Sequence, residues 1–202
     1  MLTIKEITLK NFMSVGNVTQ GVRLSDSGLT LVLGNNLDLG GDGSRNGTGK
    51  TTIANALSYG LFGQALTNIR RDNLINKTNG KHMLVMIEFI HNNITYRIER
   101  GRKPSVCRFF VNNAEQIDET DEGQGESRLT QEQIGKILCM SHNMFKHIMA
   151  LNTYTEPFLA MKQNDQRNLI EELLGITLLS EKAALLKELV RETKDKHKEE
   201  EY

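Results

Sequence analysis

The sequence predicts an α/β fold that combines hairpin strands, a glycine-rich loop before a helix, and a helical C-terminal third. Three observations predict it: extended and loop patterns in the first third, alternating apolar residues in the middle, and helical spacing thereafter. With 202 residues, of which 38% are apolar, the chain can bury one sizeable core. The apolar share is low, so part of the chain is expected to be exposed to solvent on all sides.

The first third is expected to be two extended segments followed by a loop and a helix. Apolar residues nearly alternate from Leu2 to Leu9, and a second, almost continuous apolar run extends over 29–33 and ends at Gly34. A run of this kind is typical of a strand that is buried on both faces. A loop rich in Gly and Asn follows to Gly49, and apolar residues with helical spacing begin after Lys50.

The middle of the chain, from about Lys81 to Asn113, predicts antiparallel hairpins. Residues 82–90 are largely apolar, and residues 94–100 alternate strictly between apolar and polar side chains. The pairs Asn92-Asn93 and Asn112-Asn113 are turn signals at the ends of such strands.

The last third predicts helices, one of them beginning near Asn164 and running to Gly175. The sequence places a boundary at 176/177, with a lobe over 1–176 and the start of a long helix over 177–202. An apolar stripe from Leu178 to Val190 precedes a polar end. The stripe spans about two heptads, too few to prove a coiled coil. The chain ends within this helix, which suggests a piece of a longer protein.

Composition excludes several classes of protein. Lys and Arg total 25 and Asp and Glu total 25, which argues against a polycationic nucleic-acid tail. No apolar run is long enough for a membrane span, and the first residues do not resemble a signal peptide. Cys107 and Cys139 have no CxxC or His-rich neighbours and are interpreted as reduced thiols. A cytoplasmic protein without a membrane partner is expected.

The most informative segment lies between the apolar run 29–33 and the following helix, where a phosphate-binding loop belongs. Gly47 and Gly49 allow the backbone to turn its N–H groups toward phosphate oxygens, and the helix N-terminus attracts the same anion. Lys50 would neutralise the β- and γ-phosphates, Thr51 would bind magnesium through its hydroxyl, and Thr52 can reach the α-phosphate. The predicted nucleotide-binding residues are Ser44, Arg45, Asn46, Gly47, Thr48, Gly49, Lys50, Thr51 and Thr52. ATP and magnesium are the expected ligands.

Three departures from a complete phosphate-loop ATPase stand out. Ser44 replaces the first glycine of the pattern, and an insertion, Asn36–Asp42, precedes the matching residues and is expected to be a surface excursion. The acidic motif that holds magnesium and polarises water is missing. Leu84–Glu88 is its only near match, and it is interpreted as a structural strand because it lacks the Asp. No catalytic residue is therefore predicted in these 202 residues.

Several segments together resemble the SMC-like ATPases, the ABC-type heads that carry long coiled coils. They are Met1–Ser14, the run 29–34, residues 46–52, Asn73–Asn76 with the strand after it, and the segment from Phe158 to Gly175. The strongest likeness is to the SbcC type, the ATPase subunit of double-strand-break repair nuclease complexes, including its tailed-phage recombination relatives. The resemblance implies the N-terminal half of a head with a mixed sheet, antiparallel hairpins and a C-terminal helix that starts a coiled coil.

The resemblance also implies residue roles. Many relatives have a nucleotide-contacting Arg where this chain has Met13, so that contact is absent. A magnesium-contacting Gln of the family falls near Asn152, whose amide would serve the same role; the alternative is an ordinary loop amide.

The implied function is that of an ATP-binding lobe in DNA repair and recombination, which dimerises on ATP and regulates a nuclease. The implied partners are the C-terminal lobe of the same ATPase, a second head in a homodimer, a partner nuclease and DNA. The implied location is the host cytoplasm if a phage encodes the chain. ATP hydrolysis is expected only after the C-terminal lobe completes the site, and the fragment alone is expected to be inactive.

Alternatives remain open at this point. A stand-alone P-loop kinase or transferase would need an Arg-rich lid and an Asp near the loop, and neither is evident. A non-catalytic coiled-coil scaffold would bind nucleotide only for assembly. A basic cluster, Arg97, Arg100, Arg102 and Lys103, either touches DNA phosphates or forms a solvated strand face.

Overall fold

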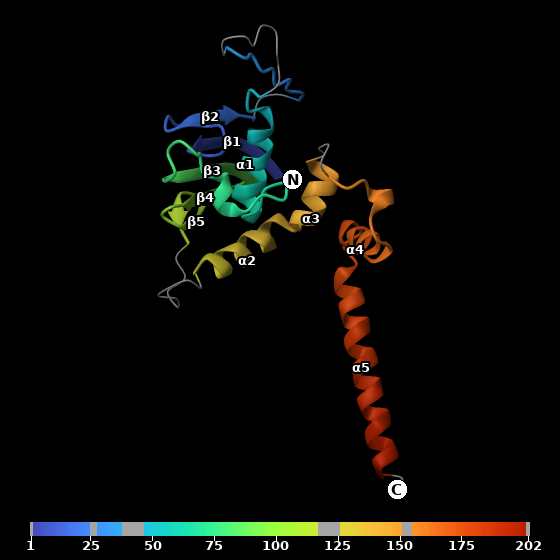
Figure 1. The fold of residues 1–202 in the computed structure, drawn as a ribbon. Helices are drawn as coiled ribbons and strands as arrows, with labels where there is room; N and C mark the ends of the chain where they lie inside the picture. The colour runs from blue at the N-terminus through green and yellow to red at the C-terminus, as the bar shows by residue number, and fades with distance from the viewer. Residues whose placement is uncertain (1, 25–27, 38–46, 117–125, 151–154, 201–202) are drawn as a thin grey trace. The chain divides into compact units, whose positions relative to one another are not determined.

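A computed structural model of the chain describes residues 2–24, 28–37, 47–116, 126–150 and 155–200 (Figure 1). The chain divides into two compact units, Met1–Thr155 and Glu156–Tyr202. Within the described residues, no helix combines the length and the apolar character that crossing a membrane requires.

The first unit is built on a six-stranded sheet with the strand order β2-β1-β3-β4-β5-β6. The strands are β1 (Leu2–Lys10), β2 (Gln20–Arg23), β3 (Met83–His91), β4 (Ile94–Arg102), β5 (Val106–Val111) and β6 (Ala114–Glu115). Every pairing among them is antiparallel. The α/β class and the antiparallel hairpins predicted from the sequence are confirmed.

Two asparagine pairs make the tight turns of these hairpins. Asn92 and Asn93 join β3 to β4 with φ of 50° and 62°, and Asn112 and Asn113 join β5 to β6 with φ of 47° and 67°. Two-residue turns with both φ values positive match the twist of antiparallel strands, and Asn tolerates this conformation better than most residues do.

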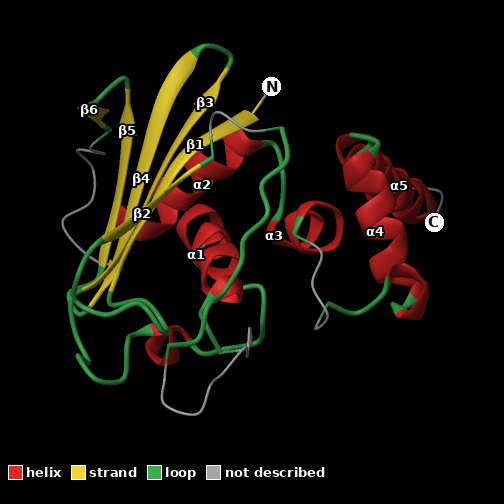
Figure 2. Cartoon of the chain, turned by 90° about the horizontal axis from the view of Figure 1, so that it is seen from above, coloured by secondary structure: helices red, strands yellow, loops and turns green. Residues whose placement is uncertain are grey.

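Helix α1 (Lys50–Phe62) lies across one face of the sheet (Figure 2). Alternate residues of the strands point toward it and are fully buried, among them Ile7, Val85, Ile87 and Ile98. Gly60 of α1 lies directly against the side chain of Ile87, leaving no room for a β-carbon. This close approach fixes α1, and with it the loop that precedes it, on the sheet.

The segment 29–34 is not the buried strand that its composition predicts. It has no strand partner among the described residues, and Leu29, Leu31 and Leu33 are 94%, 79% and 66% exposed. An apolar run forms a buried strand only where neighbouring strands cover it, and the six strands of this sheet are all antiparallel and lie elsewhere. The parallel pairing that a mixed sheet requires is therefore absent from the described part of the chain.

Four further helical elements complete the described part of the first unit. They are the 3₁₀ turn η1 (Arg71–Leu74), α2 (Glu126–Leu138), α3 (His142–Met144) and the π-helical turn η2 (Phe145–Met149). Ser141 caps α3 by accepting a hydrogen bond from the backbone N–H of Met144 at 3.1 Å. Phe145 packs on Phe62, the last residue of α1, with ring centroids 5.2 Å apart. These contacts hold α3 against the C-terminal end of α1.

The second unit contains the 3₁₀ turn η3 (Phe158–Ala160), α4 (Gln163–Leu173) and the long α5 (Thr177–Glu200). Gly175, with φ of 67°, separates the two α-helices. Apolar side chains of α5 are exposed, including Leu185, Leu186 and Leu189.

Candidate functional site

The loop before α1 has the backbone geometry of an anion-binding turn. Gly47 and Gly49 have φ of 74° and 84°, a left-handed conformation that other residues rarely adopt. Gly49 is the N-cap residue of α1 and offers no side-chain hydrogen bond, and no acidic residue stands in the first turn. The first N–H groups of α1 and the positive end of its dipole therefore face the loop. Of the predicted nucleotide-binding residues, Ser44, Arg45 and Asn46 lie outside the described part of the chain.

Two cavities adjoin this loop. One, of about 330 Å³, is lined by Met13, Ser14 and every residue from Gly47 to Thr52. The other, of about 510 Å³, shares Ser14, Gly47–Lys50 and Thr52 and extends along the exposed run to Asn36 and Leu37. No Asp or Glu is among the described residues that line either cavity. The two cavities thus present Lys50, backbone amides and hydroxyls, which is the donor set that a phosphate chain requires.

The structure brings Ser14 into this site, a residue that sequence reasoning did not select. Its Oγ lies 2.9 Å from Oγ1 of Thr52, and a β-carbon on Gly49 would stand 2.7 Å from the same Ser14 oxygen. Thr52 is buried, whereas Thr51 is exposed and lines the smaller cavity. In the sequence, Ser14 was marked only by its place at the end of the segment Met1–Ser14, which resembles the start of the SMC-like ATPases.

A network of asparagines holds the Asn11–Ser14 segment beside the loop. Asn11 is buried; its Nδ2 donates to the backbone oxygen of Lys81 at 2.9 Å, and its Oδ1 accepts from Nδ2 of Asn79 at 2.7 Å. Asn76 donates from Nδ2 to the backbone oxygen of Met13 at 3.0 Å. Met13 itself has φ of 49°, a conformation that costs free energy and persists only where its surroundings impose it. The network therefore fixes a strained backbone against the phosphate loop.

The donor set fits a triphosphate more completely than it fits a bare metal ion. Thr51 offers one hydroxyl oxygen, and among the described residues no three His, Cys, Asp or Glu side chains gather as a metal site would need. Asn152, the second predicted magnesium ligand, lies outside the described residues. Glu88, in the near match to an acidic motif, stands on β3 opposite Arg97 of β4, as expected for a structural strand.

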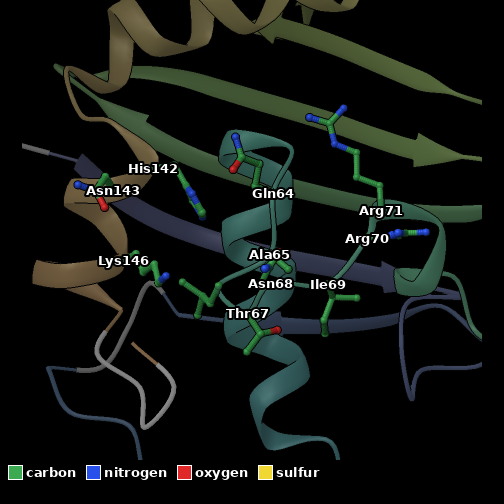
Figure 3. A pocket seen from close by; sticks show the side chains of 11 residues that line it. Gln64, Ala65, Thr67, Asn68, Ile69, Arg70, Arg71, His142, Asn143 and Lys146 are labelled. Atoms are coloured by element: carbon green, nitrogen blue, oxygen red, sulfur yellow. The ribbon is translucent and has the colours of Figure 1, made fainter. Parts of the chain in front are cut away.

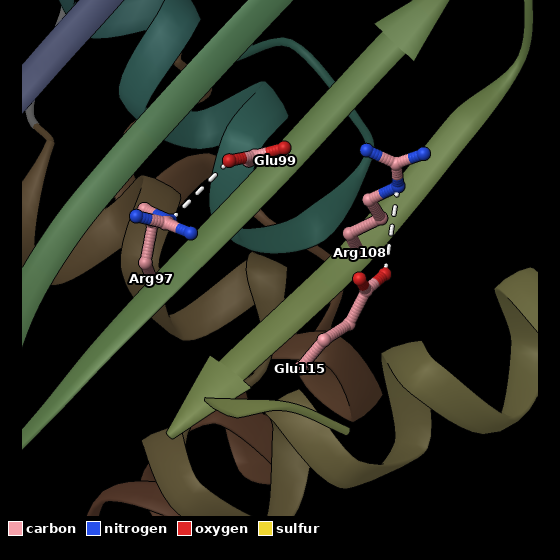
Figure 4. Close-up of polar contacts among 4 residues, drawn as sticks. All are labelled: Arg97, Glu99, Arg108 and Glu115. Carbon is pink, nitrogen blue, oxygen red and sulfur yellow. Dashed lines mark ion pairs between the residues drawn. The ribbon is translucent and has the colours of Figure 1, made fainter. Parts of the chain in front are cut away.

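The basic cluster predicted around Arg100 is largely occupied by partners within the fold. Arg97 pairs with Glu99 at 3.3 Å, and Arg108, a further arginine on this face, pairs with Glu115 at 3.5 Å. Figure 4 shows both pairs. The Arg97 guanidinium also lies 4.1 Å from the centre of the Phe110 ring. The outer face of β4 and β5 therefore carries alternating charges, as a solvated strand face does.

The other arginines of the cluster have structural roles. Arg102 pairs with Asp72 at 2.6 Å, and this contact lowers the pKa of Asp72. Arg100 is buried, and this burial lowers the pKa of its guanidinium. Its Nε donates a hydrogen bond to the backbone oxygen of Gly60 at 3.2 Å, and its Nη2 donates one to the side-chain oxygen of Gln131 on α2. Arg100 therefore ties the end of α1 to α2 and is not available to a ligand.

Comparisons with known proteins identify relatives of this chain. Residues 6–202 match the family AAA_23, described as AAA domain. The chain is 33% identical over 189 residues to exonuclease subunit 2 of Enterobacteria phage T4, and 32% identical over 191 residues to that of Escherichia phage RB69. It covers 31% of the length of each phage protein, while the matches cover 93% and 94% of this chain. The DNA double-strand break repair Rad50 ATPase of Methanococcus maripaludis is 26% identical over 201 residues, covering 95% of this chain and 18% of that protein.

Two solved structures share the fold. A structure from work on the ATP-driven dimerization and DNA-stimulated activation of SMC ATPases superposes with a TM-score of 0.55 at 20% identity, covering 85% of this chain and 99% of that one. The second is the Smc head domain with an extended coiled coil, bound to the C-terminal domain of ScpA from Pyrococcus furiosus. It superposes with a TM-score of 0.58 at 21% sequence identity, covering 96% of this chain and 48% of that one. At 20% and 21% identity these likenesses show a shared fold. The predicted resemblance is confirmed by them together with the family match and the phage and Rad50 relatives.

Proposed function

Because the chain belongs to the AAA_23 family of AAA domains, we propose that it is the ATP-binding lobe of a DNA repair and recombination ATPase that regulates a partner nuclease. The observation that carries the proposal is the loop from Gly47 to Thr52, with its two left-handed glycines and no acidic lining among the described residues. The relatives that the chain matches are exonuclease subunits and Rad50 ATPases, which supports DNA as the substrate of the whole assembly.

In this proposal each group of the loop has a defined role toward ATP. The backbone N–H groups around Gly47 and Gly49 bind the β-phosphate, and Lys50 neutralises the β- and γ-phosphates as a point charge. Thr51 holds magnesium through its exposed hydroxyl, and Ser14 positions Thr52 below the α-phosphate. When bound, magnesium would neutralise negative charge that develops on the phosphate oxygens.

The described part of this lobe supplies phosphate binding but no group that activates water. We infer that hydrolysis requires the C-terminal lobe of the same ATPase, which would contribute the acidic motif. The exposed run over 29–33 supports this, because contiguous apolar side chains on a surface mark an interaction site. The exposed leucines of α5 likewise suit an antiparallel helix that returns along it.

The proposed assembly is a homodimer of two-lobe heads with ATP bound between them. The test co-expresses the 202-residue chain with the C-terminal lobe and measures the mass of the complex by light scattering, with and without a non-hydrolysable ATP analogue and magnesium. We expect the mass to double with the analogue and to stay unchanged with ADP. A mass that is the same under all conditions would contradict nucleotide-driven dimerisation.

A further inference from the structure

Another cavity of the first unit, far from the phosphate loop, is lined by cationic and amide side chains. It has a volume of about 560 Å³ and lies between the loop after α1 and the α3–η2 segment (Figure 3). In Figure 3 Arg70 and Arg71 lie on one side of it, and His142, Asn143 and Lys146 on the other. The cavity begins at Gln64, just beyond the C-terminal end of α1, whereas the phosphate loop lies at the other end, about 20 Å away along the helix. The two sites are therefore distinct.

The charge of this cavity is unbalanced. No Asp or Glu is among its lining residues, and no ion pair of Arg70, Arg71 or Lys146 is found within the part of the chain that the structure describes. The nearest acid in the sequence, Asp72, is already paired with Arg102 at 2.6 Å. Cations held on both sides of a concave surface without carboxylates attract an anion.

A polar group in the wall also lacks a partner. Oγ1 of Thr67, a residue that lines the cavity, is buried and makes no hydrogen bond to the described residues. His142 faces the same space; burial lowers its pKa, and the adjacent Lys146 lowers it further. A bound anion would offset that repulsion and supply an acceptor for a wall hydroxyl or amide.

The lining favours phosphates of a polymer over a base or a free nucleotide. No Phe, Tyr or Trp is among the lining residues, so the cavity offers no such aromatic ring on which a nucleobase could stack. The ring of His142 is packed on Phe62 at 5.5 Å and hydrogen-bonded to Ser58 at 3.0 Å. Arginine, lysine and amide side chains are the groups that contact phosphate oxygens in nucleic-acid complexes.

We propose that the cavity between Arg70–Arg71 and Lys146 binds phosphates of a DNA backbone, independently of base sequence. The choice of DNA as the polymer rests on the proposed function. The inference that an anion binds here rests only on the side chains that line the cavity. Arg70 and Arg71 would hold one phosphate group, and Lys146 with Asn143 an adjacent one. The site would give the ATP-binding lobe its own contact with DNA.

The test measures fluorescence anisotropy of a labelled duplex of about 20 base pairs with the 202-residue chain, over roughly 50 to 200 mM salt. For the variant R70Q/R71Q/K146Q we expect affinity to fall about eightfold at ~0.1 M salt for each DNA phosphate that the variant no longer neutralises. The slope of log affinity against log salt should shrink by about 0.9 for each such phosphate. The single variant R70Q, on an exposed loop, should weaken binding by less than one such step, because Arg71 remains beside the same phosphate. The triple variant R23Q/K77Q/R108Q removes the same charge elsewhere on the first unit and should weaken binding far less.

Further measurements distinguish failure of the DNA-binding proposal from failure of the proposed function. Deoxynucleoside monophosphates at the same phosphate concentration should not displace the duplex; equal competition would overturn a backbone site. Equal weakening in the two triple variants, or no DNA binding by the unmodified chain at the lowest salt, would also overturn it. Binding of a fluorescent ATP analogue, measured on the same samples, should be unchanged in R70Q/R71Q/K146Q. Failure of the unmodified chain to bind ATP would instead contradict the proposed function.

Discussion

Replacing Lys50 with Ala is expected to weaken binding of ATP with magnesium by roughly 100-fold, or about 3 kcal/mol. Lys50 is the cation that begins α1, and it lines both cavities at the phosphate loop together with Gly47 and Gly49. Its ammonium group would make charge-assisted hydrogen bonds to phosphate oxygens that no other lining cation can replace, since among the described lining residues Lys50 is the only one. Calorimetric titration of the 202-residue chain measures the change directly.

The fold should survive this substitution. Lys50 is partly exposed at the first position of the helix, so the free energy of unfolding is expected to change by less than about 0.5 kcal/mol. Lys77→Ala, which removes an exposed lysine from a turn outside both cavities, is the matched control and should bind ATP normally. Unchanged affinity in the Lys50 variant would show that the phosphates bind elsewhere.

The double substitution Leu29→Asp and Leu31→Asp is expected to abolish association with the C-terminal lobe. Both side chains are almost fully exposed in the 202-residue chain, so their replacement should leave its thermal unfolding unchanged. Burying two leucines at an interface contributes about 3 to 6 kcal/mol, so charged replacements should weaken association by at least about 100-fold.

The measurement is co-purification of the two lobes, with a tag on one of them. Neither Leu29 nor Leu31 lines the phosphate-loop cavities, so ATP binding should persist in the double variant. Val18→Asp alters an apolar side chain that is 77% exposed on another loop and should leave the complex intact. Normal co-purification of the double variant would contradict a docking role for the run 29–33.

Local patterns predicted the hairpins well because the paired strands follow one another in the chain, and they predicted α1 because helical spacing is itself a local signal. Strands β3 and β4 are joined by Asn92-Asn93, and each carries alternating apolar residues that one helix covers. The glycines at 47 and 49 likewise require only local geometry, and both have a left-handed conformation that other residues rarely adopt.

The run 29–34 was misassigned because its burial depends on neighbours that are not among the described strands. Composition gives the apolar character of a segment but not what covers it. Ser14 was missed because its proximity to Thr52 depends on hydrogen bonds that its neighbour Met13 makes with Leu74 and Asn76, about 60 residues away in the sequence. Arg100 was grouped with exposed cations because strand alternation does not reveal that Gly60 and Gln131 accept its hydrogen bonds. The cationic cavity beside α3 joins residues 64–71 to residues 142–146, a pairing that no local pattern contains.

The most direct test of the proposed function is ATP turnover by the 202-residue chain, alone and with the C-terminal lobe. Phosphoryl transfer to water needs a magnesium-binding acid and a group that orients water, and the described cavities at the phosphate loop contain no acid. We predict negligible hydrolysis by the chain alone, magnesium-dependent hydrolysis when the C-terminal lobe is co-expressed, and no hydrolysis by the Lys50→Ala complex. Robust, magnesium-dependent turnover by residues 1–202 alone would contradict the account and identify the chain as a self-sufficient P-loop enzyme.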